Sequence, residues 1–536
     1  MAVINQFDKR SGITYVYESI SYWDKEKQQP RAKRKLIGRR DPQTGEVVPT
    51  DGRGKKRYEN PENIQLTKPG PIPIDTLARR FYGATYLLDE IGKVLGVNED
   101  LKQCFPEVYK QIQSIAYYLI LESDSPLFRF EKWSTLHKHP FDKNIPSQRS
   151  SEIFADISEE QKSKFFKLQE RRRSEDEYWA YDTTSLSSYS QTLRQVQYGK
   201  NKEDDRLPQI NLALVFGERS GLPFYYRKLA GNIPDVSTVK NLLADFQALG
   251  FDKVKLVMDR GFYSESNING LFKEHLKFIV AVQTGISFVR NEIDKVYESL
   301  RSFENLDEQH GLYVTTALTE WNYQQERPYK KDVIEEKKRI YLHIYFNIEK
   351  YADDETTFDR KLMSMRKEVL SGKRAPEHET FYKKYFEIKE TPVRGVQVTV
   401  KDEAVRKVKR YYGYFTLLSN EKMDAMNALQ LYRNEDVVEK AFGNIKDRLN
   451  LRRLLVSSEK SLDGKLFVGF IALIYLAHIK KCMQESGMYQ KYTLQTLLDK
   501  LDVIECFENP GYALRTGEVL SKQKQIYEAL GINPPA

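Results

Sequence analysis

The feature that most constrains the fold is the order of strand-like and helix-like runs between residues 177 and 285. Three β-prone runs come first, separated by turn residues. An amphipathic run then predicts a helix, with Asp235 or Ser237 as its N-cap and Gly250 as its C-cap. A short buried strand, a second helix and a further strand follow. This order predicts an α/β fold, with a mixed sheet flanked by helices.

The length of the chain and the changes in its pattern of helix-like and strand-like segments predict several domains. At 536 residues the chain is too long for one ordinary core. A polar, β-rich excursion interrupts the α/β pattern, which predicts an inserted subdomain rather than a loop. The predicted segments are an N-terminal basic, β-prone segment (1–70), a helical region (71–175), the first part of the α/β core (176–287), the β-rich insertion (288–405), the last part of the core (406–485) and a C-terminal helical tail (486–536).

Composition indicates a globular protein with clustered positive charge. Hydrophobic residues make up 40% and charged residues 30%, and the formal net charge is +9. Basic clusters such as "RAKRK" at 31–35, "GKKR" at 54–57 and "RRR" at 171–173 suit a polyanion. For any single cluster, a scattered solvated face is an equally good interpretation.

The spacing of the cysteines and the length of the apolar runs argue against a zinc-finger, disulfide-bonded or membrane protein. The three cysteines lie far apart without a CxxC motif, so a zinc finger or disulfide framework is not expected, and a reducing cytosol is. The N-terminal sequence has no apolar signal core. The apolar run at 466–479 is shorter than a membrane span and predicts a buried helix. No membrane partner is therefore expected.

Three carboxylates stand out in this framework. Asp182 lies in the first predicted strand, and Asp259 ends the strand "KVKLVMD", where α/β sheets form sites. Each has an ordinary alternative: Asp259 as a turn or capping residue, and Asp182 as a strand-edge residue bonded to Thr184. The third is Glu439, in a run at 431–453 that predicts one helix.

On a helical wheel that run has an apolar stripe and a polar shoulder. Tyr432, Glu439 and Lys446 share one line beside the stripe. A partly exposed helix with a polar shoulder explains this line as well. The stripe consists of Val438, Ala441, Phe442, Ile445 and Leu449.

Three carboxylates without a Cys/His set are hard oxygen ligands of the kind that Mg²⁺ takes. Asp182, Asp259 and Glu439 are therefore predicted to bind metal. Two Mg²⁺ ions, for which Mn²⁺ is expected to substitute, would suit an in-line phosphoryl displacement. A phosphodiester substrate would also account for the basic clusters.

The motifs "YDTTSL", "AGNIPDVST", "VMDRGFYSESNI" and "YRNEDVVEKAFGNIK", in this order, resemble the DDE insertion-sequence transposases. The resemblance is to the branch with a Tyr–Arg–Glu–Lys signature, and it covers about 175 to 480. It implies an RNase H-like core with a β-rich insertion and a catalytic metal triad of Asp182, Asp259 and Glu439.

The same resemblance implies DNA-binding residues. Tyr432 and Lys446 occupy the signature's tyrosine and lysine, which contact phosphates at the transposon end. The arginine position holds Glu435, and Arg452 and Arg453 are candidates to supply that contact instead.

The function implied is Mg²⁺-dependent DNA cleavage and strand transfer at insertion-sequence ends. The implied partners are double-stranded DNA, both terminal inverted repeats and target, and a second copy of the chain as a homodimer on DNA. The 71–175 region is expected to bind DNA, and the location to be cytoplasmic, at the nucleoid. Two alternatives remain: a non-catalytic, transposase-derived DNA-binding protein, and an RNase H-like nuclease without strand transfer.

Overall fold

The structure is a computed structural model that divides into two compact units, 1–77 with 508–513, and 78–507 with 514–536. The side chains of Asp436, Val437 and Glu439 lie outside what it describes. The described residues are 2–9, 12–24, 27–42, 44–49, 77–123, 125–172, 176–190, 192–200, 202, 206–326, 333–391, 395–434, 436–449, 451, 454, 456, 458–509 and 512–536.

The first unit contains an antiparallel four-stranded sheet. Its strands follow chain order: β1 (Ala2–Asp8), β2 (Ile13–Asp24), β3 (Gln29–Arg40) and β4 (Val47–Val48). Val16 is buried, but most side chains of β3, including those of "RAKRK", are exposed. The segment predicted as β-prone forms a sheet over its described residues, and most side chains of its basic strand are exposed to solvent.

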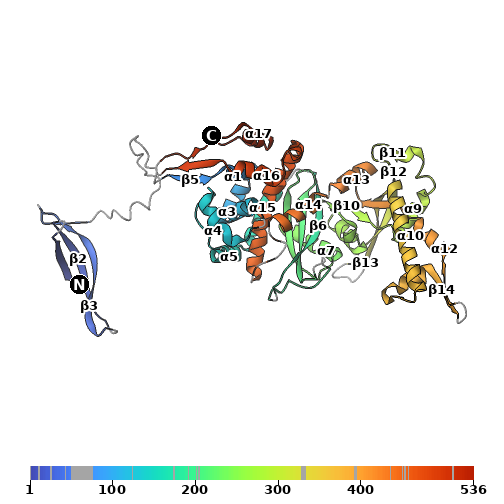
Figure 1. The fold of residues 1–536 in the computed structure, drawn as a ribbon, viewed down its shortest axis with the longest axis horizontal. Coiled ribbons are helices and arrows are strands. Elements are labelled where there is room, and N and C mark those ends of the chain that lie inside the picture. The colour runs from blue at the N-terminus through green and yellow to red at the C-terminus, as the bar shows by residue number, and fades with distance from the viewer. Residues whose placement is uncertain are drawn as a thin grey trace. The chain divides into compact units, whose positions relative to one another are not determined.

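The second unit begins with a helical group that surrounds one long helix, α15 (Glu459–Glu485). Helix α15 packs against α3 and α5 on one side and strand β8 on the other (Figure 1). The group comprises α1 (Gly83–Val94), α2 (Val97–Cys104), α3 (Tyr109–Leu121), α4 (Phe130–Leu136), α5 (Ser147–Asp156) and α6 (Glu159–Glu170).

Two further helices and a small sheet complete this part of the unit. The helices are α16 (Leu494–Asp502) and α17 (Ser521–Ala529). The sheet has the order β18–β17–β5, with β5 (Ala78–Phe81), β17 (Glu505–Glu508) and β18 (Arg515–Thr516).

Helix α15 contains the apolar run at 466–479. Among the described residues it is the one helix long and apolar enough to cross a membrane, but most of its apolar stretch is buried inside the protein. Leu466, Ile471 and Ile479 are each at most 2% exposed. The prediction of a buried helix is therefore confirmed.

A nine-stranded mixed sheet forms the centre of the second unit, which confirms the predicted mixed α/β class. Its order is β11–β12–β13–β16–β10–β9–β6–β7–β8. The strands are β6 (Tyr178–Ser187), β7 (Gln209–Gly217), β8 (Pro223–Ala230), β9 (Lys255–Met258), β10 (Lys277–Val282), β11 (Leu306–Asp307), β12 (Leu312–Glu326), β13 (Val333–Asn347) and β16 (Tyr414–Ser419).

Strands β6, β9 and β10 run parallel, β7 and β16 join them antiparallel, and β8 pairs antiparallel with β7. The connections include α7 (Asp235–Leu249), α8 (Glu265–Lys273) and α9 (Ser287–Val296). Gly250 caps α7 with φ of 74°, as predicted. Its N-cap is Pro234, so neither Asp235 nor Ser237 is the cap, and Asp235 becomes the first helical residue.

The segment predicted as an insertion has two parts. Strand β13 pairs with β16 and β12 pairs with β13, so both strands extend the central sheet. The rest has its own small core, which includes Met365, Tyr382 and Val398. Its elements are α10 (Ile348–Leu370), α11 (Glu379–Tyr385), β14 (Phe386–Thr391), β15 (Gly395–Val400) and α12 (Asp402–Lys409).

The run at 431–453 is not one helix, which corrects the wheel used above. Helix α13 (Ala425–Arg433) ends before Asn434, whose side chain donates a hydrogen bond to the carboxylate of Glu218. Helix α14 (Asp436–Gly443) then continues as the π-helical turn η7 (Asn444–Arg448). A π-turn adds a residue per turn, so a constant 100° step does not relate Tyr432, Glu439 and Lys446. The apolar stripe is nevertheless buried, from Val438 to Leu449.

Candidate active site

The pairing of two parallel strands places Asp182 beside Asp259. Tyr181 of β6 is in register with Met258 of β9. Asp182 is the next residue of β6, and Asp259 directly follows the end of β9, on neighbouring strands that lie about 4.8 Å apart. The charge of Asp259 acts on the Asp182 carboxylate, so the two side chains lie close together.

Asp182 lies in a crowded environment that is mostly buried. One carboxylate oxygen accepts a hydrogen bond from the backbone N–H of Thr183, at 2.6 Å. Lys202 Nζ lies 3.8 Å from the same oxygen. Burial raises the pKa of Asp182 to about 6, Lys202 and the Thr183 N–H oppose this rise, and the carboxylates of Asp235 and Asp259 add to it.

Asp235 is a further carboxylate at this place, although the sequence pattern predicted for it only a capping role. It accepts a hydrogen bond from the Thr183 hydroxyl, and Lys202 Nζ lies 3.5 Å from its other oxygen. Lys202 also donates to the Thr183 carbonyl, at 2.5 Å. Lys202 therefore bridges two carboxylates. An acid at the start of a helix directly after "AGNIP" is the signal that could have drawn attention to Asp235.

Asp259 is held from the opposite side by the predicted phosphate-binding tyrosine. The Tyr432 hydroxyl donates to Asp259 Oδ1, at 2.9 Å. Tyr432 is at the end of α13, whereas Asp259 precedes the 3₁₀ turn η4 (Arg260–Phe262). A cavity of about 650 Å³ opens here, lined by Asp259, Tyr432 and other residues. Its further lining includes Arg260, Lys350, Tyr411, Tyr412 and Phe415.

The helix that carries Glu439 lies over the same sheet. Helix α14 packs against β6 and β7, with Val438 and Ala441 buried beneath it. The backbone of Glu439 thus belongs to an element that covers the strand of Asp182. Lys446 lies in the π-turn and is half-buried. Other predicted residues, Glu435, Arg452 and Arg453, and the Glu439 side chain, lie outside the described residues.

The chemistry of this donor set fits a hard divalent cation. Asp182 and Asp259 offer neighbouring carboxylate oxygens, and burial, to which the charges of Asp235 and Asp259 add, raises the pKa of Asp182. Oxygen ligands of this type are those that Mg²⁺ and Mn²⁺ take. Within the described part of the chain no three His, Cys, Asp or Glu residues, Asp235 included, are arranged so that they could hold a metal ion.

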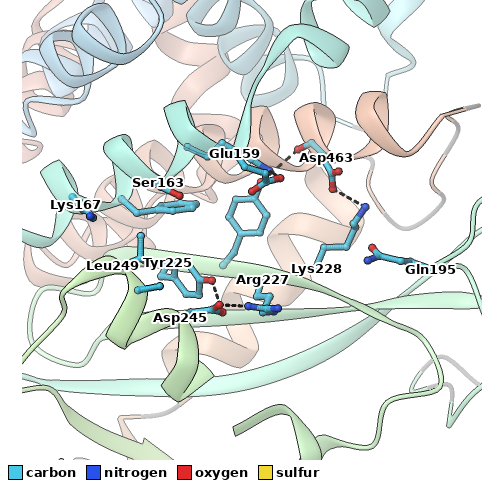
Figure 2. Close-up of a pocket in the computed structure, with 14 residues that line it drawn as sticks. Glu159, Ser163, Lys167, Gln195, Tyr225, Arg227, Lys228, Asp245, Leu249 and Asp463 are labelled. Carbon is cyan, nitrogen blue, oxygen red and sulfur yellow. Dashed lines mark hydrogen bonds and ion pairs between the residues drawn. The ribbon is translucent and has the colours of Figure 1, made fainter. Parts of the chain in front are cut away.

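A second cavity, of about 360 Å³, lies between α6, β8 and α7 (Figure 2). Most of its charged residues are paired: Arg227 with Asp245, and Lys228 with Asp463 at 2.6 Å. Tyr225 also donates to Asp245, at 2.6 Å. Neither Asp182 nor Asp259 lines this cavity, and its self-compensated charge gives it no reason to attract an ion.

Comparisons with known proteins bear on this arrangement. No curated protein matches the chain. The fold resembles that in the cryo-EM structure of a piggyBac transposase synaptic complex with hairpin DNA, with a TM-score of 0.34 and 11% identity over 74% of this chain and 70% of that one. Residues 163–475, more than half of the chain, match the family described as Transposase DDE domain. The chain therefore belongs to the DDE-domain transposase family.

Proposed function

We propose that the protein cleaves DNA at insertion-sequence ends and transfers the freed strand to target DNA, in a metal-dependent reaction. The observation that carries the proposal is the register of β6 and β9, which places Asp182 beside Asp259 in the family's matched region. The family name supports action on DNA, and the paired carboxylates supply the chemistry that phosphodiester cleavage needs.

We further propose that the core is RNase H-like. The order β8–β7–β6–β9–β10, with β6, β9 and β10 parallel, supports this assignment. The branch with the Tyr–Arg–Glu–Lys signature is proposed on Tyr432, Glu439 and Lys446. Glu435 in the arginine position would leave that contact to Arg452 or Arg453.

In this proposal Asp182, Asp259 and Glu439 hold the metal ions, with Mg²⁺ as the working ion and Mn²⁺ as a substitute. Bound there, divalent ions supply an activated nucleophile and stabilise the leaving oxygen. Tyr432 orients Asp259 through its hydroxyl. Lys202 neutralises part of the charge on Asp182 and Asp235.

The partners follow from the reaction. We propose that the N-terminal sheet and the helical region contact terminal inverted repeats, and that a homodimer forms on DNA because two ends must be joined. Mixing wild type with an Asp259→Asn chain should then reduce activity more steeply than simple dilution. We also propose that the protein is cytoplasmic and associated with the nucleoid, where its DNA substrate would lie.

The test is cleavage of DNA that carries the insertion-sequence ends. Mg²⁺ or Mn²⁺ should support nicking, and EDTA should abolish it. Glu439→Gln keeps side-chain volume but removes the charge that a metal ion needs, so cleavage should fall by about a hundredfold or more while the melting temperature is retained. Wild-type cleavage by Glu439→Gln, or full activity in EDTA, contradicts the mechanism.

The same experiment separates the alternatives. A non-catalytic DNA-binding protein would bind the ends without nicking them under any metal condition. A nuclease without strand transfer would nick DNA but give no joined products. The presence of Asp182, Asp259 and Glu439 together favours catalysis over simple binding.

A further inference from the structure

A groove with uncompensated positive charge lies behind the helix that carries Glu439. Two adjoining cavities, of about 580 and 540 Å³, share four lining residues, and we call the pair the groove. The shared residues are Lys440, Asn444, Lys480 and Tyr489. Lys440 belongs to α14, Asn444 to the π-turn and Lys480 to α15, so the groove runs where these three elements meet.

Lys440, Lys480 and Arg448 line this groove, and none of them forms an ion pair with an acid among the described residues, although the charge of Asp499 acts on Arg448. Lys440 is exposed and forms no ion pair there. Lys480 is half-buried, and Nζ donates to the neutral Asn444 side chain, at 2.5 Å. Burial, together with the charges of Arg448 and Lys440, lowers the pKa of Lys480. The three cations therefore repel one another in the absence of an anion.

Arg448 gives a second, independent sign of a missing anion. Its guanidinium donates to the neutral Gln495 side chain, at 2.5 Å, and to the Ile120 carbonyl, at 3.3 Å. Its buried Nε–H has no hydrogen-bond partner among the described residues. Buried donors are normally satisfied, so an arginine held this way has unused capacity for an acceptor.

The acids that line the groove are engaged in other contacts. Glu218 accepts a hydrogen bond from Asn434, and Glu485 lies 3.8 Å from Lys481. Asp447 also has a partner of its own. No ion pair joins these acids to Lys440, Lys480 or Arg448 among the described residues.

The remaining lining suits a nucleic-acid backbone. The groove includes Tyr489 and Tyr492, and the first residues of α16, Leu494 and Gln495. Lysine, arginine and tyrosine side chains and helix N-termini are the groups that contact phosphates in protein–DNA complexes. Its length over two cavities exceeds what one small anion would fill.

We propose that this groove binds the phosphate backbone of duplex DNA that leaves the active site past α15, with Lys440, Arg448 and Lys480 as the contacts. The proposal rests on the proposed function, since it takes DNA as the substrate. Lys440 directly follows Glu439 on α14, so DNA in this groove lies alongside the catalytic helix.

The test measures how DNA binding depends on salt, using the full chain and a random-sequence 30-base-pair duplex in EDTA. Each phosphate contact contributes about 0.9 to the slope of log affinity against log salt concentration. Lys440→Gln with Lys480→Gln should make the slope shallower by about 2 and weaken binding by about tenfold or more at low salt. In the Lys480→Gln variant the side-chain amide can still donate a hydrogen bond to Asn444.

Matched controls are Lys500→Gln with Lys522→Gln, which remove the same charge from two exposed lysines outside the groove. This pair should keep the wild-type slope. Removing mutually repelling cations should also leave the melting temperature of the groove variant unchanged or higher. If the double variant does not fold, Lys440→Gln alone should reduce the slope by about 1.

Several outcomes overturn the proposal. An unchanged slope in the groove variants does so, as does an equal loss of slope in the control pair. A groove that serves an acidic protein segment would also leave the DNA slope unchanged. Wild-type cleavage in Mg²⁺ is measured in parallel: cleavage with unchanged slopes refutes the groove alone, whereas wild type that neither binds nor cleaves DNA refutes the proposed function too.

Discussion

At the scale of single residues, the carboxylates of the site carry negative charge that the cation Lys202 neutralises only in part. Asp182, Asp235 and Asp259 lie close together, and Lys202 is the cation that contacts two of them. Lys202 lies 3.5 Å or more from either carboxylate, so it screens them without forming a close pair. This arrangement predicts that the metal-free protein is less stable when Asp182 is ionised.

Asp182→Asn should therefore stabilise the metal-free protein at neutral pH. Burial raises the pKa of Asp182 from 3.8 to about 6, so the folded state holds this proton more tightly than the unfolded state. The free energy of unfolding of the wild type should then fall as pH rises from about 4 to 6, by at most about 3 kcal/mol from this group. The variant cannot lose that proton and should lack this fall.

Chemical denaturation in EDTA at several pH values measures this difference. Asp499→Asn, at an exposed position on α16, is the control and should follow the wild-type pH profile. A variant that is no more stable than wild type at pH 7 would show that the charge on Asp182 is neutralised within the protein.

At the scale of elements, the close packing of α15 on α5 depends on a glycine. Gly464 of α15 approaches α5 so closely that a Cβ there would lie 2.0 Å from the backbone oxygen of Phe154. That oxygen belongs to the main chain and cannot turn aside as a flexible side chain would. The helix therefore needs glycine at this position for contact rather than for backbone freedom.

Gly464→Ala should destabilise the protein although alanine is the better helix former. The overpacking cost of about 1–3 kcal/mol exceeds the gain in helix propensity of about 1 kcal/mol. Gly443→Ala is the matched control, since nothing lies within 4 Å of the added carbon. It should be neutral or raise the free energy of unfolding by about 0.5–1 kcal/mol. Thermal and denaturant unfolding compare the two, and equal effects would contradict this account of the α5–α15 contact.

At the scale of the whole molecule, the N-terminal unit carries exposed positive charge on β3. Lys33 and Lys35 are exposed on β3, opposite Ile20 and Glu18 of β2. They share one face because alternate residues of a strand point the same way. A single sheet with such exposed faces gains little from burial, and its exposed lysines are the groups through which the proposed contact with DNA would be made.

Lys33→Gln with Lys35→Gln in the full chain should weaken binding to end-containing DNA and lower the salt slope by about 2. Lys33→Arg with Lys35→Arg keeps the charges and should bind like the wild type. Binding titrations at several salt concentrations measure both. Wild-type affinity in the glutamine variant would mean that the N-terminal sheet does not contact the DNA.

Local sequence determined much of the molecule. Apolar periodicity specified the buried stripe from Val438 to Leu449 and the buried helix α15, because side-chain burial follows the spacing of apolar residues. Gly250 specified the end of α7 through its left-handed conformation. The motif order also pointed to the transposase family, to which the match over 163–475 assigns the chain.

Only the tertiary structure decided how these elements meet. The register of β6 on β9, which brings Asp182 to Asp259, joins segments far apart in the chain, and no local pattern encodes such a pairing. The contact of Asn434 with Glu218 accompanies the break between α13 and α14, and the π-turn shifts Lys446 from its expected line. Likewise, Asp235 and Lys202 join the site because they contact Thr183 across the fold. Sequence periodicity reports each residue's own element, whereas these contacts depend on partners that only the folded chain brings within reach.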